Sequence, residues 1–398
     1  MQTSKEKKSK PNTVKSTRRL LLVFSALFLV ATIAATEYNI LSTTIQQAFN
    51  LKLNAPDSTF NENLLTHRLI NIDSEMNLVD KATKEKALSN VNAYLSEVRN
   101  SCQAKESETA YISCANEILS NYFAYQPSAL TSLSYAKQVS DCDLNSYLIY
   151  DAARMKNIDI GVVYAPVHAF VAYKERGAYK YWDTVYSDQK GGLVDFSNQI
   201  YKKDFSPFYY RPQNEKTIID TYKGFAFSKA KNQNIEDIIS LSKDNPENVF
   251  LSTIKYTKLQ DMSLLNKEDV TTIENSIQLN LTNTLLPLVL SEYYLANKEF
   301  DKARDYLLSM NKSDCGEPCF EIGSKLGLPI YKVHNNLYKL YSYFVEKQEH
   351  EPDEDAYMTS FAFLCVSIFF FFLYIITPAG VFAFMFIDKK IKSRRNKQ

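Results

Sequence analysis

Hydrophobic and polar positions follow two different rhythms along this chain. From about residue 50 to residue 125, apolar and aromatic residues recur every three or four positions, which predicts helices, one of them over residues 80–102. Another helix is expected over residues 140–156. The spacing then changes to two in "IDIGVVYAP", "VHAFVAYK" and "YKYWDTVY", which predicts short strands joined by turns. Helices followed by an antiparallel sheet predict an α+β module over residues 65–215.

Helical spacing returns after this module and continues to about residue 350. The segment "LPLVLSEYYLANKEFDKARDYLLSM" predicts two helices joined at "ANKEF". Five of its residues lie where a tetratricopeptide-type hairpin places its packing side chains. They are Leu290, Tyr294, Phe300, Ala303 and Leu307. An ordinary helical hairpin fits this pattern equally well, so residues 216–350 are predicted to form a helical, partly tetratricopeptide-like subdomain suited to protein contacts.

Two uncharged apolar runs lie near the ends of the chain, at residues 20–36 and 358–387. About 20 apolar residues cross a bilayer as a helix, so the second run is long enough for a transmembrane helix. The first run is shorter and has two interpretations, an uncleaved membrane anchor or a cleaved signal peptide. The long basic leader and the poor cleavage site at "TIAAT" favour the anchor.

Charge is strongly segregated, which the overall net charge of +1 conceals. The tails at residues 1–19 and 388–398 hold 13 Lys or Arg and two acidic residues, so 33 basic and 43 acidic residues remain between them, a net charge of −10. Basic residues flank the cytoplasmic ends of membrane helices, which predicts cytoplasmic tails and an exported part, beginning with a linker at residues 37–64. The net negative charge of the exported part argues against nucleic-acid binding.

The six cysteines also bear on the compartment. Cys365 lies in the second apolar run, and the other five lie in the exported part, where cysteines tend to pair. The predicted disulfides are Cys102 with Cys114 and Cys315 with Cys319. Other pairings are possible, but this scheme leaves Cys142 over, which indicates a partner in another chain or a reactive thiol. No second Cys or His lies near Cys142 at ligand spacing, so neither a metal site nor a cofactor is expected.

Cys142 lies in "SDCD", which has the pattern of a capping box. Ser140 is predicted to cap the helix, with Asp143 three residues on. Cys142 would then lie in the first helical turn, where the helix dipole favours a thiolate. The flanking carboxylates of Asp141 and Asp143 oppose this, because like charges raise a thiol pKa when they face it.

Two further residues complete a candidate catalytic set. His168 begins the predicted strand "HAFVAY", and Asp183 ends the next one in "YKYWDT". A nucleophilic Cys needs a base to take its proton, and that base needs a group to orient it. A histidine in an apolar strand is commonly a packed core residue, and an Asp at a strand end commonly forms a turn. In this order, however, the three residues predict a Cys-His-Asp triad.

These motifs resemble the transglutaminase-like superfamily, and in particular its bacterial cysteine proteinases. The resemblance covers residues 88–190 and rests on "DC" opening a helix, a "GV" strand, "HAFV" and "YWDT". It implies a papain-like core and acyl-transfer chemistry. It further implies that Cys142 is the nucleophile, His168 the base and Asp183 the orienting acid.

An oxyanion donor is the weakest part of the resemblance. Gln138 is the nearest candidate side chain, and the backbone N–H of Cys142 is a second candidate. The sequence also departs from the family pattern: it lacks a Gly shortly before Cys142 and has Phe170 where the family often has Trp.

The sequence therefore predicts a membrane-anchored, exported thiol hydrolase in the bacterial cytoplasmic membrane. As a peptidase or amidase it would act on an envelope protein or peptide, and an amine in place of water would give cross-linking instead of hydrolysis. The alternative is a non-catalytic scaffold or docking module in an envelope assembly. The expected partners are the lipid bilayer and an envelope or surface protein that contacts the helical subdomain.

Overall fold

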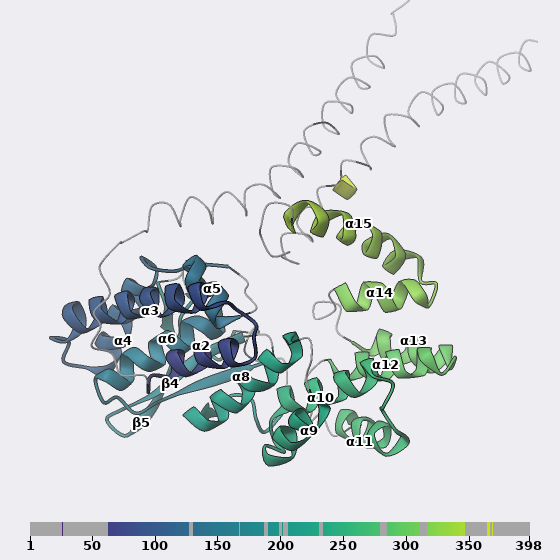
Figure 1. The fold of residues 1–398 in the computed structure, drawn as a ribbon, viewed down its shortest axis with the longest axis horizontal. Coiled ribbons are helices and arrows are strands. Elements are labelled where there is room, and N and C mark those ends of the chain that lie inside the picture. Colours follow the sequence, from purple (N-terminus) through teal and green to yellow (C-terminus); the bar gives the residue numbers. More distant parts are fainter. Residues whose placement is uncertain are drawn as a thin grey trace, which may run out of the picture. The chain divides into compact units, whose positions relative to one another are not determined.

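The computed structural model (Figure 1) describes the following parts of the chain. They are residues 63–126, 130–166, 168–186, 190–198, 201, 206–230, 234–278, 285–310 and 317–346, with residues 26, 364–366 and 368 in addition. Within these residues no helix is both long enough and apolar enough to cross a membrane. The two predicted membrane runs lie almost wholly outside them, as do both basic tails, most of the linker and Cys315.

The chain divides into two compact units. One is formed by its two ends, and the other, Thr43–Leu340, contains all the residues of the candidate site. A helical group precedes the sheet in this second unit. Its members are α2 (Leu65–Glu75), α3 (Lys81–Cys102), α4 (Glu108–Leu119), α5 (Thr131–Lys137) and α6 (Cys142–Met155). The N-caps Asp80 and Ser107 begin α3 and α4 by accepting hydrogen bonds from the backbone N–H of Thr83 and Ala110.

A five-stranded antiparallel sheet follows, in the order β6-β5-β4-β3-β7. The strands are β3 (Ile160–Ala165), β4 (His168–Glu175), β5 (Ala178–Asp183), β6 (Gly192–Leu193) and β7 (Pro212–Gln213). The β4–β5 hairpin turns on Arg176 and Gly177, whose φ angles are 52° and 83°. Positive φ at both central residues is typical of a two-residue hairpin turn that matches the strand twist. The turn predicted between these two strands is thus present.

The sheet is covered on both faces, as Figure 1 shows for the side on which α2–α6 gather. Alternate residues of β4 point to opposite faces. Ala169, Val171 and Tyr173 join the main core with the helices. Phe170 joins a smaller core on the other face, which contains Tyr201. The sheet therefore places the start of β4 next to α6 and the end of β5 next to the segment around residue 201.

The chain is helical again after the sheet, and these helices form a second hydrophobic core. They are α8 (Glu215–Lys229), α9 (Ile235–Asp244), α10 (Val249–Asp261), α11 (Lys267–Gln278), α12 (Leu286–Ala296), α13 (Phe300–Ser309), α14 (Glu317–Lys325) and α15 (Pro329–Glu346). The α+β class and the helical part after it are as the sequence predicts. α8 packs against α2, and the second core runs from Tyr256 to Leu326.

The predicted helical hairpin consists of α12 and α13. Four of its five expected packing residues are buried: Leu290, Tyr294, Ala303 and Leu307. Phe300 is 52% exposed, so its predicted packing role is wrong. It is the first residue of α13, and helical side chains tilt toward the N-terminus, which here carries the ring past the end of the hairpin.

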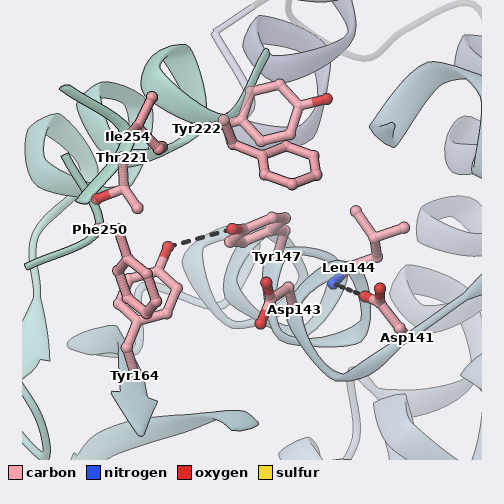
Figure 2. Close-up of a pocket in the computed structure, with 10 residues that line it drawn as sticks. Asp141, Asp143, Leu144, Tyr147, Tyr164, Thr221, Tyr222, Phe250 and Ile254 are labelled. Atoms are coloured by element: carbon pink, nitrogen blue, oxygen red, sulfur yellow. Dashed lines mark hydrogen bonds between the residues drawn. The ribbon is translucent and has the colours of Figure 1, made fainter. Parts of the chain in front are cut away.

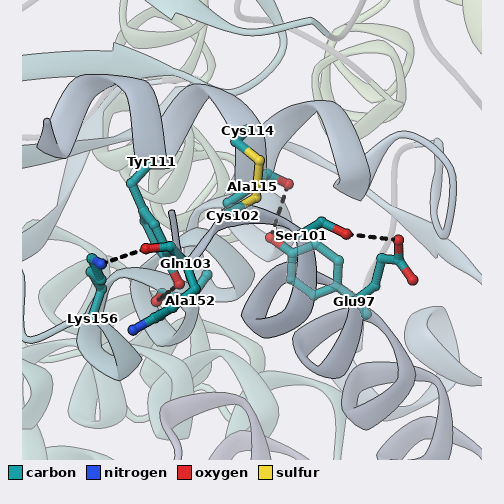
Figure 3. The surroundings of a disulfide bond; sticks show 10 residues. Glu97, Ser101, Cys102, Gln103, Tyr111, Cys114, Ala115, Ala152 and Lys156 are labelled. Carbon is teal, nitrogen blue, oxygen red and sulfur yellow. Dashed lines mark hydrogen bonds between the residues drawn. A yellow bond between two sulfur atoms is a disulfide. The ribbon is translucent and has the colours of Figure 1, made fainter. Parts of the chain in front are cut away.

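The disulfide between Cys102 and Cys114 confirms one predicted pair (Figure 3). It joins the end of α3 to α4, beside Tyr111, whose hydroxyl donates a hydrogen bond of 3.0 Å to the Ala152 carbonyl of α6. Cys319 is also disulfide-bonded, to a partner outside the described residues. Cys142 has a free thiol.

Candidate functional site

The start of α6 differs by one residue from the sequence prediction. Asp141, not Ser140, is the N-cap, and its side chain accepts a hydrogen bond from the Leu144 N–H at 3.1 Å (Figure 2). Ser140 belongs to β2 (Val139–Ser140), which pairs with β1 (Ala124–Tyr125), and its hydroxyl bonds to Asn145 instead. Pairing with β1 keeps Ser140 extended, so Asp141 caps the helix and Cys142 is its first residue.

The Cys142 thiol is half-buried and lies beside a carboxylate. Its sulfur is 3.7 Å from Oδ1 of Asp143. Burial raises the pKa of the Cys142 thiol well above its ordinary value, and the charges of Asp143 and Asp141 raise it further. Hydrogen bonds from the backbone N–H groups of Ala169 and Asp143 lower it by less. The helix start therefore does not produce a thiolate, and the resting group is a neutral thiol.

His168 and Asp183 form a buried hydrogen-bonded pair. Nε2 of His168 lies 2.9 Å from Oδ2 of Asp183, and the two residues are 8% and 3% exposed. Burial alone would raise the pKa of Asp183, but the hydrogen bonds from His168, the Tyr201 hydroxyl and the Val185 N–H outweigh it and lower the pKa. An ionised Asp183 only accepts hydrogen bonds, so Nε2 donates and Nδ1 is the ring nitrogen left for proton transfer.

The thiol lies at the same end of β4 as this pair. The backbone N–H of Ala169, the residue after His168, bonds to the Cys142 sulfur. Within the described residues, the hydrogen bonds of the thiol and the imidazole do not include one between the two groups. Asp143 interacts with both: it accepts a hydrogen bond from the thiol, and the charge of His168 lowers its pKa, which burial raises overall.

Buried hydrogen bonds fix the two residues that flank Asp183 in the chain. The Trp182 indole N–H donates to Oδ1 of Asn116 at 3.2 Å, and the Asn116 side-chain amide donates to the Thr184 carbonyl at 3.2 Å. The backbone of Gly191 lies so close to Trp182 that an added Cβ would be 2.5 Å from the indole nitrogen. Asn116, on α4, thereby fixes the residues on both sides of Asp183.

The two oxyanion candidates and a tyrosine lie near the start of α6. The Gln138 side chain donates a hydrogen bond of 3.4 Å to the Tyr122 carbonyl and so is already engaged. Tyr125, opposite Ser140 in the β1–β2 pair, was not predicted. Burial raises its pKa, and the charge of Cys142 raises it further, so its hydroxyl stays protonated near the thiol. The backbone N–H of Cys142 remains the better-placed candidate of the original two, because it begins the helix.

A cavity of about 270 Å³ opens beside this helix start (Figure 2). Asp141, Asp143 and Leu144 of the α6 start line one side. Aromatic rings from α6, β3, α8 and α10 line the rest. No local sequence pattern indicated that α8 and α10 would reach the site.

The structure thus brings His168 and Asp183 into contact and places Cys142 beside the residue after His168. Sequence reasoning missed Tyr201, Asn116 and Tyr125, because their link to the site exists only through tertiary contacts. Comparisons of the chain with protein-family models, with curated proteins and with solved structures find no match. The chemistry proposed below therefore rests on the residues and their geometry.

Proposed function

We propose that the protein is a membrane-anchored thiol hydrolase with a transglutaminase-like, papain-like core. It acts as a peptidase or amidase on an envelope protein or peptide. The observation that supports this most directly is the buried His168–Asp183 pair, which lies at the end of β4 where Cys142 begins α6. Fixing a ring nitrogen through an ionised carboxylate is what a general base at a nucleophilic thiol requires.

The proposed reaction has two stages. In the first, Nδ1 of His168 takes the thiol proton as the Cys142 sulfur attacks an amide carbonyl. The S–C bond forms, the C–N bond breaks, and the imidazolium gives its proton to the leaving amine. In the second, His168 takes a proton from water as the water attacks the thioester. The S–C bond breaks, the imidazolium returns its proton to the sulfur, and a carboxylic acid and the free thiol are released. The backbone N–H of Cys142 stabilises the oxyanion in both stages, and an amine in place of water yields a cross-link.

The raised pKa of Cys142 decides how the thiol is activated. A preformed thiolate–imidazolium pair is not the resting state, because burial and two carboxylates favour the neutral thiol. Proton transfer to His168 therefore accompanies attack on the substrate. The same observation favours the second candidate function, a non-catalytic docking module, in which Cys142 would be a packed residue without a reaction.

The proposed location is the bacterial cytoplasmic membrane, with both tails inside and the described part outside. The Cys102–Cys114 disulfide supports an oxidising compartment, where such bonds persist. The apolar runs and their basic flanks support two membrane spans. The helices after the sheet are the proposed contact surface for an envelope or surface partner.

Cleavage of a peptide library tests the proposal. The purified full-length protein is incubated with proteome-derived peptides, and new N-termini are counted by mass spectrometry. Cleavage is expected from the wild type and from the exposed-surface control Glu117→Gln, and is expected to disappear in Cys142→Ala and His168→Ala. Cleavage that survives Cys142→Ala contradicts the thiol mechanism, and absence of cleavage from the wild type favours the docking module.

A further inference from the structure

We propose that the cavity beside α6 is the specificity pocket of this site and takes the cationic side chain of a lysine or arginine in the substrate. The inference rests on the proposed function, since it adds a substrate class to the same thiol site. Its basis is a cavity that combines two carboxylates with aromatic walls next to the nucleophile (Figure 2).

The size of the cavity fits one long side chain. Pockets for whole drug-sized ligands run from roughly 300 to 1,000 Å³, and this one measures about 270 Å³. Asp143 joins it to the reaction centre, because this residue lines the cavity and its Oδ1 lies 3.7 Å from the Cys142 sulfur. A side chain bound in the cavity therefore belongs to a residue next to the bond that is cleaved.

The described residues that line the cavity carry charge of one sign. Among them, Asp141 and Asp143 are the only titratable groups other than tyrosines, and none is a Lys, Arg or His. Burial raises the pKa of Asp143 by more than the charge of His168 and the hydrogen bond from the Cys142 thiol lower it, so a further positive charge would stabilise the Asp143 carboxylate. Within the described residues, no ion pair joins Asp143 to a Lys or Arg. A bound ammonium or guanidinium group supplies the missing positive charge.

The walls of the cavity favour a cation on a long stem. Tyr147 and Tyr164 face each other with their hydroxyls 3.1 Å apart, and the rings of Tyr222 and Phe250 stand beside them (Figure 2). Aromatic faces attract cations within about 6 Å of the ring centre. They also pack against the methylene groups of Lys and Arg. Ile254 adds a further apolar surface for that stem.

A pair of covalent probes measures this preference. Two peptidyl vinyl sulfones differ only in the residue before the warhead: lysine in one, and norleucine, which has the same carbon chain without the ammonium group, in the other. The lysine probe is expected to label Cys142 of the full-length protein at least about tenfold more efficiently, since a charge-assisted hydrogen bond contributes roughly 1.5–3 kcal/mol. An arginine probe is expected to match the lysine probe.

Substitutions locate the source of the preference. Asp143→Asn is expected to bring the lysine-to-norleucine ratio close to one, and Asp141→Asn, which keeps a capping side chain, to lower it partly. The exposed control Glu117→Gln should leave it unchanged. Because the ratio compares two probes on one variant, a change in thiol reactivity cancels.

Failure of the pocket and failure of the proposed function give different results. Equal labelling by both probes, with labelling still dependent on His168, overturns the pocket and leaves the thiol hydrolase standing. Where neither probe gives His168-dependent labelling, the hydrolase fails. The pocket is then judged by calorimetry on Cys142→Ala with Nα-acetyl-lysine amide and its norleucine counterpart. Tighter binding of the lysine compound, lost in Cys142→Ala/Asp143→Asn, supports the pocket, and equal binding overturns it.

Discussion

At the scale of single residues, burial raises the pKa of the Cys142 thiol most, and Asp143 is the charged group that raises it further. Its carboxylate lies 3.7 Å from the Cys142 sulfur and is the largest charge effect that raises the thiol pKa. Asp143→Asn should lower that pKa, because a neutral amide no longer repels the thiolate. Alkylation of Cys142 by iodoacetamide at pH 7 is then expected to become several-fold faster, with the midpoint of its pH profile shifted to lower pH.

Mass spectrometry of the labelled peptide follows this rate. Glu117→Gln removes a carboxylate from the exposed surface and should leave the profile in place. An unchanged or slower rate in Asp143→Asn contradicts the assigned electrostatic effect.

Tyr201 acts on the reaction through Asp183 and is therefore a positioning residue. Its hydroxyl donates to the same Oδ2 that binds His168. Tyr201→Phe removes one of the hydrogen bonds that lower the pKa of Asp183, so that pKa should rise. The acidic limb of the pH profile for Cys142 labelling is expected to move to higher pH by up to about one unit, so the rate falls more at acidic pH than at pH 7. A uniform fall in rate at every pH would instead indicate general damage to the fold.

At the scale of elements, the start of α2 depends on a residue of α6. The local N-cap Leu64 offers no side-chain bond, and Asp151 accepts from the Leu65 and Thr66 N–H groups, both at 2.8 Å, and from the Thr66 hydroxyl. Burial raises the pKa of Asp151 to about 6. The folded protein therefore holds this proton more tightly than the unfolded chain between about pH 4 and pH 6, and stability falls as pH rises through that range.

Asp151→Asn tests this linkage by removing the titrating group. One pKa unit corresponds to 1.36 kcal/mol, so the Asp151 contribution to the free energy of unfolding should fall by about 2 to 3 kcal/mol from pH 4 to pH 7. Urea unfolding of wild type and variant across this range gives the difference between them. A difference that does not vary with pH contradicts the raised pKa.

Gly191 permits the close contact between β5 and the loop that precedes β6. Its φ is +70°, and an added Cβ would lie 2.5 Å from the Trp182 indole nitrogen and 2.8 Å from Asn116. Gly191→Ala should destabilise the fold by roughly 1–3 kcal/mol. It should also shift the emission of Trp182, the only tryptophan of the chain.

Gly177→Ala is the matched control for that substitution. Its φ of +83° is similarly unfavourable for alanine, but nothing lies within 4 Å of the added Cβ. It should therefore cost less stability and leave the tryptophan emission unchanged. Equal effects of the two substitutions would show that backbone strain alone, and not the contact with Trp182, explains the loss.

Elements with a local signal were predictable from the sequence. The apolar residues at helical spacing predict α3, and Arg176 and Gly177 predict the β4–β5 turn. In both cases the signal lies within a few neighbouring residues of the sequence. The first residue of α6 was not predictable in this way, because the pairing of Ser140 with Tyr125 is a tertiary contact. The same applies to the site, where the order of Cys, His and Asp was visible but the support from Tyr201 was not.

At the scale of the whole molecule, the candidate site is assembled from distant parts of one compact unit. The proposed nucleophile and base come from α6 and β4, and the far wall of the cavity comes from α8 and α10. The helices after the sheet therefore do more than follow the α+β module. They complete the surface against which a substrate would lie, which links the proposed chemistry to the proposed partner contacts.

Activation of the Cys142 thiol by His168 would make the alkylation rate of Cys142 depend on His168. The full-length protein is treated with iodoacetamide at pH 7, and labelling of Cys142 is compared between the wild type, His168→Ala and Asp183→Asn. If His168 is the base, Cys142 labelling slows by about tenfold or more in His168→Ala and by less in Asp183→Asn. Equal rates of Cys142 labelling in the wild type and His168→Ala would contradict this role of His168.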